Sequence, residues 1–341
     1  MKKKWMVAFV CLLLLLPMTL MAGGQQEAED MGAGEAEAEM EEPMQIGVAL
    51  DNLNDPFWLG IKKGIDDAGA ELGVELVIRT AEGDAVKQNS QIDDMIAQGV
   101  DGMVCVYVDS KSILQAVKAC NEAGIPFVYC DRTVASTSDA RVDWGIATDN
   151  KALTMNGWKW MADYARENGM KLKVLELVGS LSDENVLNRT DGFEEVMAAN
   201  TDIITRVQQV PTEWNLEKAL AGTTNALQAN PDINCIFMHS DYLLGATISA
   251  LRQAGRYKKI GEEGHVAVMP YSGNEASLNA MREGYVEMCF GMDVYKTGYE
   301  AVMAAYEIAN GEERGAPVAD PGFIITQENF DEMSQRAYGS F

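Results

Sequence analysis

Residues 46–58 read I-G-V-A-L-D-N-L-N-D-P-F-W, and their pattern indicates an α/β fold. The apolar run at 46–50 predicts a buried strand, which ends at polar residues before Pro56 opens a helix. Four side chains suited to ligand contact are therefore expected at the carboxyl end of one strand: Asp51, Asn52, Phe57 and Trp58. Ligands bind at that edge of open α/β sheets, so the stretch also predicts a binding site.

Short β-rich runs alternate with amphipathic helical patterns along the rest of the chain. The predicted strands span residues 46–50, 74–79, 102–107, 126–130, 145–148, 172–178, 203–210, 233–238, 265–269 and 285–290. This alternation predicts right-handed crossovers and parallel sheets with helices on both faces. The length exceeds one comfortable core, so we expect two doubly wound Rossmann-like lobes with a cleft between them.

The first 45 residues precede this fold. Three lysines, an apolar run from Trp5 to Leu16 and small residues around Ala22 are typical of a secretory signal peptide, predicted as residues 1–22. An uncleaved membrane anchor is the alternative, whereas Cys11 lacks the small residues that precede a lipoprotein cysteine. Residues 23–45 are rich in Glu, Gly and Ala without aromatic or β-branched residues, which predicts a disordered acidic tether.

Charge and cysteine content exclude several classes of protein. Without the three signal lysines, 24 Lys and Arg remain from 27 against 52 Asp and Glu, a net charge of about −28. Such a chain is a poor partner for nucleic acid, which is bound through basic surface. Four of the cysteines lie within apolar runs without a Cys-x-x-Cys pair, which favours buried thiols over disulfides: Cys105, Cys130, Cys235 and Cys289.

Polar residues follow the predicted strands repeatedly. They are Asp51-Asn52, Tyr107, Asp131-Arg132, Thr148-Asp149, Ser180, Ser240-Asp241 and Tyr271-Ser272. Asp, Ser and Thr also cap helices, and for Thr148, Asp149 and Ser240 that role is as good an interpretation as ligand contact. Asp131 beside Arg132 favours the cleft, because the pair offers fixed acceptors and a donor fork.

Six further segments extend the pattern of residues 46–58. They are A-E-G-D-A-V-K-Q-N-S-Q-I-D-D-M-I-A-Q-G-V-D-G-M (81–103), N-E-A-G-I-P-F-V-Y-C-D-R-T (121–133), A-T-D-N (147–150), N-R-T-D-G-F (188–193), N-P-D-I-N-C-I-F-M-H-S-D (230–241) and Y-S-G (271–273). Together they resemble the periplasmic sugar-binding proteins of the ribose and galactose type. The similarity runs in unbroken order from Ile46 to about Phe330.

The resemblance implies the type I periplasmic binding protein fold, with three crossovers between the lobes. The N-terminal lobe would hold residues 46–148 and 293–321, and the C-terminal lobe 149–292 and 322–341. The implied function is non-enzymatic: a periplasmic monomer closes on a sugar or polyol and hands it to the permease of an ABC importer, without cofactor or metal.

The resemblance also implies which residues contact the ligand. The first lobe would contribute Asp51, Asn52, Phe57, Trp58, Asp131 and Arg132, with Tyr107 as an extra aromatic. The second lobe would contribute Arg189, Trp214, Ser240, Asp241, Tyr271 and Ser272. Trp214 matches the family's second-lobe aromatic, so a sugar ring could lie between it and Phe57 or Trp58; aromatic faces suit the C–H faces of a sugar.

Departures from the ribose binders lie in the expected pocket. The ribose binders carry Asn near Tyr107 and at Ser240, Asp at Ser272, and Gln near Met292-Asp293. An unpaired buried ribose hydroxyl would cost about 1–3 kcal/mol, so ribose is a poor candidate. We expect a different pyranose, a polyol or a cyclitol.

Rival classes lack their sequence signatures. No G-x-G-x-x-G follows a predicted strand, and neither a phosphate-binding G-x-x-x-x-G-K-S/T nor a G-x-S-x-G elbow occurs. His239 and His265 have no Cys or carboxylate at metal-ligand spacing, and Pro56 and Lys62 interrupt a calcium-loop pattern at Asp51. A repressor-type sensor would need a helix-turn-helix before Ile46. A nucleoside or signalling ligand, and a role in chemotaxis, stay open as alternatives.

Overall fold

The computed structural model describes residues 43–134, 136–181 and 183–337. The signal peptide predicted at 1–22 and nearly all of the tether predicted at 23–45 lie outside these residues. The first strand begins at Gln45, one residue before the predicted start. Among the described helices, none combines the length and the apolar character needed to cross a membrane.

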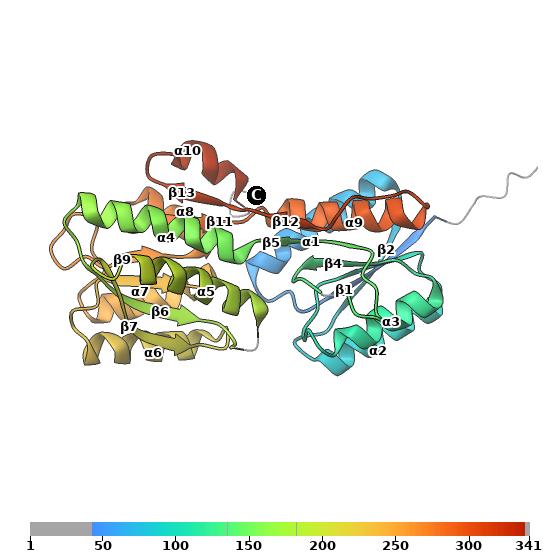
Figure 1. Ribbon diagram of the computed structural model, residues 1–341, viewed down its shortest axis with the longest axis horizontal. Helices are drawn as coiled ribbons and strands as arrows, with labels where there is room; N and C mark the ends of the chain where they lie inside the picture. Colours follow the sequence, from blue (N-terminus) through green and yellow to red (C-terminus); the bar gives the residue numbers. More distant parts are fainter. Residues whose placement is uncertain (1–42, 135, 182, 338–341) are drawn as a thin grey trace, which may run out of the picture. The chain divides into compact units, whose positions relative to one another are not determined.

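The first lobe is built on a six-stranded parallel sheet with the order β12-β5-β4-β3-β1-β2. Its strands are β1 (Gln45–Leu50), β2 (Glu75–Thr80), β3 (Gly102–Cys105), β4 (Phe127–Asp131), β5 (Trp144–Thr148) and β12 (Val318–Asp320). Alternate residues of β1 point to opposite faces: Val48 packs in the core below α1 (Pro56–Leu72) and α9 (Val294–Ala309), and Ala49 packs in the core below α2 (Ala85–Gln98) and α3 (Ile113–Ala123). Helices therefore cover both faces of this sheet (Figure 1).

Helices α1 and α9 pack closely because each has a glycine at the contact. An added Cβ on Gly64 would lie 2.0 Å from the carbonyl oxygen of Tyr295, and one on Gly298 would lie 2.0 Å from that of Ile61. Only residues without a side chain permit this approach. A helix from the C-terminal part of the chain thus completes the first lobe.

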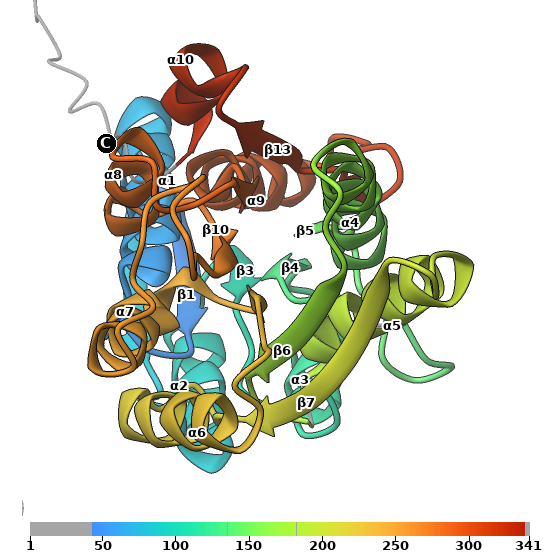
Figure 2. The same ribbon diagram turned by 90° about the vertical axis from the view of Figure 1, so that its left-hand side faces the viewer.

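The second lobe contains a four-stranded parallel sheet with the order β7-β6-β8-β9. These strands are β6 (Leu172–Val178), β7 (Ile204–Pro211), β8 (Cys235–Met238) and β9 (Ala267–Met269). Helices α4 (Asn150–Glu167) and α5 (Glu184–Ala199) lie on one side, and α6 (Leu216–Ala229) and α7 (Leu244–Gln253) on the other (Figure 2). Two short elements, the 3-10 helix η1 (Asp241–Leu243) and α8 (Glu275–Arg282), follow β8 and β10.

A small mixed sheet, which was not predicted from the sequence, adjoins the second lobe in addition to the two parallel sheets. It comprises β10 (Tyr271–Ser272), β11 (Met288–Gly291) and β13 (Phe323–Thr326), and β11 pairs antiparallel with β13. The chain leaves the second lobe at the end of β11, passes through α9 and β12, and re-enters the lobe at the start of β13, so β11 and β13 run in opposite directions. The chain then ends its described part in α10 (Phe330–Met333) and η2 (Ser334–Arg336).

The chain passes between the lobes three times. The passages follow β5 into α4 at residues 148–150, β11 into α9 at 291–294, and β12 into β13 at 320–323. This confirms two doubly wound lobes joined by a three-stranded hinge. The lobe boundaries predicted at 148/149, 292/293 and 321/322 lie close to these passages.

The cysteines of the described residues are buried and free, which confirms the predicted buried thiols. Burial raises the pKa of each thiol well above its ordinary value at Cys105, Cys130, Cys235 and Cys289. Cys120, which follows the helical pattern of α3, is buried as well.

Candidate ligand-binding site

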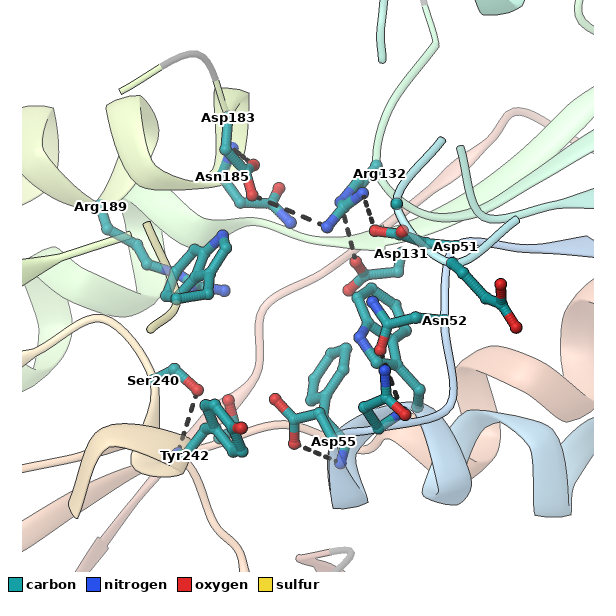
Figure 3. A pocket seen from close by; sticks show the side chains of 17 residues that line it. Asp51, Asn52, Asp55, Asp131, Arg132, Asp183, Asn185, Arg189, Ser240 and Tyr242 are labelled. Atoms are coloured by element: carbon teal, nitrogen blue, oxygen red, sulfur yellow. Dashed lines mark hydrogen bonds and ion pairs between the residues drawn. The ribbon is translucent and has the colours of Figure 1, made fainter. Parts of the chain in front are cut away.

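A cavity of about 310 Å³ lies between the carboxyl edges of the two large sheets, and residues of both lobes line it. This volume is at the lower end of the range of about 300–1,000 Å³ found for small-molecule sites. Figure 3 shows the two walls, with Arg189, Ser240 and Tyr242 facing Asn52, Asp55 and Arg132 across the open space. The cavity therefore suits one small ligand that touches both lobes.

The end of β1 and the start of α1 form an aromatic wall. Asp55 caps α1 by accepting a hydrogen bond from the Phe57 backbone N–H at 2.9 Å, and Pro56 occupies the first helical turn. In this first turn of α1, the rings of Phe57 and Trp58 lie edge to face, with centroids 4.9 Å apart. Burial raises the pKa of the Asp55 carboxyl.

The end of β4 supplies a carboxylate and a guanidinium. Arg132 donates to Asp51 Oδ2 at 2.9 Å, and its nitrogens lie 4.0 Å from Asp131 and 3.8 Å from Asp183 (Figure 3). Burial lowers the pKa of Arg132, but these three carboxylates outweigh burial and raise it. Burial raises the pKa of Asp131 to about 6. The guanidinium also lies over the Trp58 ring, 5.1 Å from its centroid.

Arg189 of α5 extends the second wall. Its Nε donates to Asn150 Oδ1 at 2.8 Å and another guanidinium nitrogen donates to the His239 carbonyl. The guanidinium lies 4.1 Å from the centroid of the Tyr271 ring, whose hydroxyl donates to the Asn150 carbonyl at 3.2 Å. Tyr271, Asn150 and His239 therefore fix the position of Arg189.

His239 belongs to a buried polar network behind this wall. Its Nε2 lies 3.0 Å from Glu176 Oε1, and Glu176 also accepts from Arg206 at 2.9 Å and Gln209 at 2.8 Å. Burial lowers the pKa of His239, which favours the neutral imidazole. The partner carboxylate is 63 residues away in sequence, so sequence spacing did not reveal it. His265 likewise pairs with Glu287.

Trp214 lies against Gly179 at the end of β6. A Cβ added to Gly179 would be 2.0 Å from the indole ring, so the glycine lets the ring lie flat on the strand end. Trp214 itself has φ +56°, in the left-handed region that side chains seldom adopt. The position of the indole therefore depends on the left-handed backbone of Trp214 and on the absence of a side chain at Gly179.

Positive φ angles of non-glycine residues gather at the cavity. Within the described ranges they occur at Glu82, Asp131, Glu213, Trp214 and Ser272, and all except Glu213 line the cavity. Such conformations persist only where surrounding structure imposes them, and they cluster at functional sites. The unusual backbone conformations therefore indicate the same cavity as the functional site that the side chains indicate.

Most of the predicted site residues line this cavity. They are Asp51, Asn52, Phe57, Trp58, Asp131, Arg132, Arg189, Trp214, Ser240 and Ser272. The structure places Tyr107, Asp241 and Tyr271 outside the lining. The Tyr107 hydroxyl donates to the Thr133 carbonyl at 3.1 Å, Asp241 accepts from the Asn274 backbone, and Tyr271 is fully buried beneath Arg189.

Of the strand-end residues, Asp149 is a helix cap alone, and Ser240 is both a helix cap and a cavity residue. Asp149 caps α4 by accepting from the Ala152 backbone at 2.9 Å and does not line the cavity. Ser240 accepts from the Tyr242 backbone at 3.1 Å and lines the cavity as well.

The sequence interpretation missed several lining residues: Asn54, Asp55, Glu82, Gly83, Asp183, Asn185 and Tyr242. Asp55 and Asp183 are the helix caps in the loops that follow strands β1 and β6. An aspartate at such a position can serve a helix and a ligand together, and that pattern was visible in the sequence.

The chain belongs to the periplasmic binding protein family. A family model described as a periplasmic binding protein domain matches residues 46–313. Members of this family are non-catalytic binding proteins.

Two relatives and one solved structure define the similarity further. The chain is 28% identical over 283 residues to the ribose import binding protein of Bacillus subtilis, covering 83% of this chain and 87% of that protein. It is 26% identical over 290 residues to the putative rhizopine-binding protein of Rhizobium meliloti, covering 84% and 92%. An ABC transporter solute binding protein from Bacillus halodurans with bound myo-inositol has the same fold, with a TM-score of 0.76 at 23% identity over 86% of this chain and 98% of that one.

Proposed function

We propose that this protein is an exported solute-binding protein that captures a sugar or sugar-like polyol and delivers it to the permease of an ABC importer. The observation that carries this proposal is the composition of the cavity. Aromatic rings from both lobes, Trp58 and Trp214, line it together with the charged groups of Asp131, Arg132 and Arg189. Aromatic faces suit the C–H faces of a polyol, and fixed carboxylates and guanidiniums suit its hydroxyls.

The ligand would act by stabilising a closed arrangement of the lobes. A ligand shifts such an equilibrium only by binding one state more strongly than the other, and contacts to both walls provide that difference. The pair of Arg132 in the first lobe and Asp183 in the second, 3.8 Å apart, adds a protein contact across the cavity. Binding and closure are therefore coupled in this proposal.

The names of the relatives support a polyhydroxy ligand without identifying it. They include a ribose import binding protein and a xylitol-binding protein, at 28% and 26% identity. In this proposal the chain works as a monomer in the periplasm, where its predicted signal peptide would send it. Ribose itself is disfavoured, because Ser240 and Ser272 line the cavity where the ribose binders carry longer polar side chains.

Thermal-shift screening followed by calorimetry tests the proposal. The panel contains aldoses, ketoses, polyols, cyclitols, nucleosides and amino acids. A ligand at 100 times its Kd stabilises the protein by about 2.7 kcal/mol, which should raise the melting temperature by several degrees. If only a nucleoside or an amino acid stabilises the protein, the polyol assignment is wrong.

A matched pair of tryptophan variants locates the binding. Trp214→Ala removes the second-lobe ring from the cavity, whereas Trp160→Ala removes an indole of α4 that stacks on Tyr164 outside it. We expect the first change to weaken binding at least about tenfold and the second to leave affinity unchanged. Equal effects would mean that the ligand does not contact Trp214.

A further inference from the structure

The cavity contains more carboxylates than cations. Four aspartates line it, Asp51, Asp55, Asp131 and Asp183, against two guanidiniums, those of Arg132 and Arg189. A fifth carboxylate, Glu82 at the rim, pairs with Lys87 at 3.0 Å and is largely exposed, so water and lysine compensate it. Asp55 and Asp183 are half-buried and each accepts one backbone hydrogen bond as a helix cap, whereas Asp51 and Asp131 are buried. Buried charges are stable only when they are paired.

One guanidinium lies within ion-pair distance of three of these aspartates. Arg132 lies 2.9 Å from Asp51, 3.8 Å from Asp183 and 4.0 Å from Asp131. Asp51 is 7% exposed, and its Oδ1 has no hydrogen-bond partner in the described structure. Asp131 is 3% exposed and has no carboxylate hydrogen bond among the described residues. A single positive charge therefore leaves this group of acids undercompensated.

The second guanidinium acts on Asp131 from a distance and forms no ion pair with any of these aspartates in the described chain. Arg189 donates to the neutral oxygens of Asn150 and His239 and stacks on Tyr271, and no carboxylate of the described chain lies within ion-pair distance of it. Asp55 likewise has no cation within 4.0 Å in the described ranges, and its one structural task is to cap α1. The Asp55 carboxylate faces the cavity (Figure 3).

We propose that the ligand is an aminated polyol, an amino sugar or an aminocyclitol, whose protonated amine is held by Asp55 and Asp131. This inference rests on the proposed function and names the substrate class of the same cavity. An ammonium group supplies the missing positive charge and donates three hydrogen bonds, which the free carboxylate oxygens accept. A neutral polyol satisfies the hydroxyl-binding groups but leaves the excess charge in place.

Matched pairs of compounds separate this inference from the proposed function. The pairs are D-glucose and D-glucosamine, D-galactose and D-galactosamine, and D-glucitol and 1-amino-1-deoxy-D-glucitol, with myo-inositol and an aminocyclitol as the fourth. Calorimetry at pH 7.5 should show that, within the pair that binds, the amine is bound at least about tenfold more tightly. Equal or tighter binding of the neutral member overturns the amine inference and leaves the polyol function standing. If no member of any pair binds, both fail.

Asp55→Asn tests the recognising residue, because asparagine caps helices as well as aspartate does. Asp84→Asn is the matched control, since Asp84 caps α2 in the same way, accepting from Val86 at 2.8 Å, but does not line the cavity. Asp55→Asn should abolish most of the preference for the amine over its neutral partner, and Asp84→Asn should preserve it. A preference that survives Asp55→Asn contradicts the assignment of that carboxylate.

The pH dependence of ligand affinity tests whether Asp131 contacts the amine, because a purely structural role of Asp131 would affect both members of a pair alike. The cavity groups that face Asp131 are Asp51, Arg132, Asp183 and Arg189. An amine requires the ionised form of Asp131, so amine affinity should fall as the pH is lowered from 8 to 5, whereas neutral affinity should change little. Parallel pH profiles for the two members of a pair would overturn the inference.

Discussion

Replacing Asp131 by asparagine should stabilise the protein at neutral pH. Asp131 ends β4 with φ +69°, a conformation that asparagine adopts at least as readily, so the exchange leaves the backbone unstrained. The change removes a negative charge that is 3% exposed and whose one ion pair within the described residues is with Arg132, at 4.0 Å. Arg132 keeps Asp51 and Asp183, so its own charge stays compensated.

The size of the effect follows from the pKa of Asp131. Burial raises it from 3.8 to about 6, so the folded protein binds the proton more tightly than the unfolded chain does. Ionising Asp131 therefore destabilises the fold, by about 3 kcal/mol above pH 6 at 1.36 kcal/mol per pKa unit. This cost declines as the pH falls through 6 and disappears below 3.8; at pH 5 it is about 1.6 kcal/mol by the same linkage relation.

Urea unfolding at pH 8 and pH 5 measures the difference. Asp131→Asn should raise the free energy of unfolding by up to about 3 kcal/mol at pH 8 and by roughly half as much at pH 5. Asp94→Asn, at an exposed position of α2, is the control and should change neither value by more than about 0.5 kcal/mol. A destabilised Asp131→Asn, or a gain that does not depend on pH, would refute the reasoning.

Three further predictions concern the cavity and the core. Gly179→Ala should displace the Trp214 ring and weaken ligand binding at least about tenfold. Gly245→Ala is the control, because its added Cβ meets nothing within 4 Å, and it should leave affinity unchanged. Equal affinities of the two variants in calorimetry would contradict this prediction. Arg189→Lys keeps the positive charge but loses the planar set of guanidinium donors, so we expect the Kd for the ligand to rise at least about tenfold with little change in the heat-unfolding profile. An unchanged Kd would place Arg189 outside the binding contacts. The buried cysteines should react with a thiol reagent only after unfolding in urea, and rapid labelling of the native protein would show that they are accessible.

The sequence predicted the architecture because the strand signal is strong where strands are buried on both faces. The run at 46–50 is continuously apolar and the run at 172–178 is mostly apolar, and the structure has β1 and β6 there with shifts of at most one residue. The pattern failed at β12 (Val318–Asp320) and β13 (Phe323–Thr326), which are short and mostly exposed or half-buried. These strands form by pairing with strands elsewhere in the chain, and no local hydrophobic periodicity predicts them.

The site was predictable to the extent that it follows strand ends. Asp51 directly follows β1, Asp131 ends β4, and Ser240 lies two residues after β8; all three line the cavity. The role of Tyr271 was not predictable, because only the packing of Arg189 against its ring shows that it supports the wall from behind. The shortage of cations was equally hidden, since it depends on how three aspartates from separate segments share Arg132.

A crystal structure of the complex with the tightest-binding polyhydroxy compound shows where the ligand binds. We expect the ligand in the cavity between the lobes, in contact with Trp58 and Arg132 on one side and with Arg189 and Trp214 on the other. For an aminated ligand, the nitrogen should lie within hydrogen-bond distance of both Asp55 and Asp131. A ligand that contacts only one lobe, or that binds outside this cavity, would contradict the account.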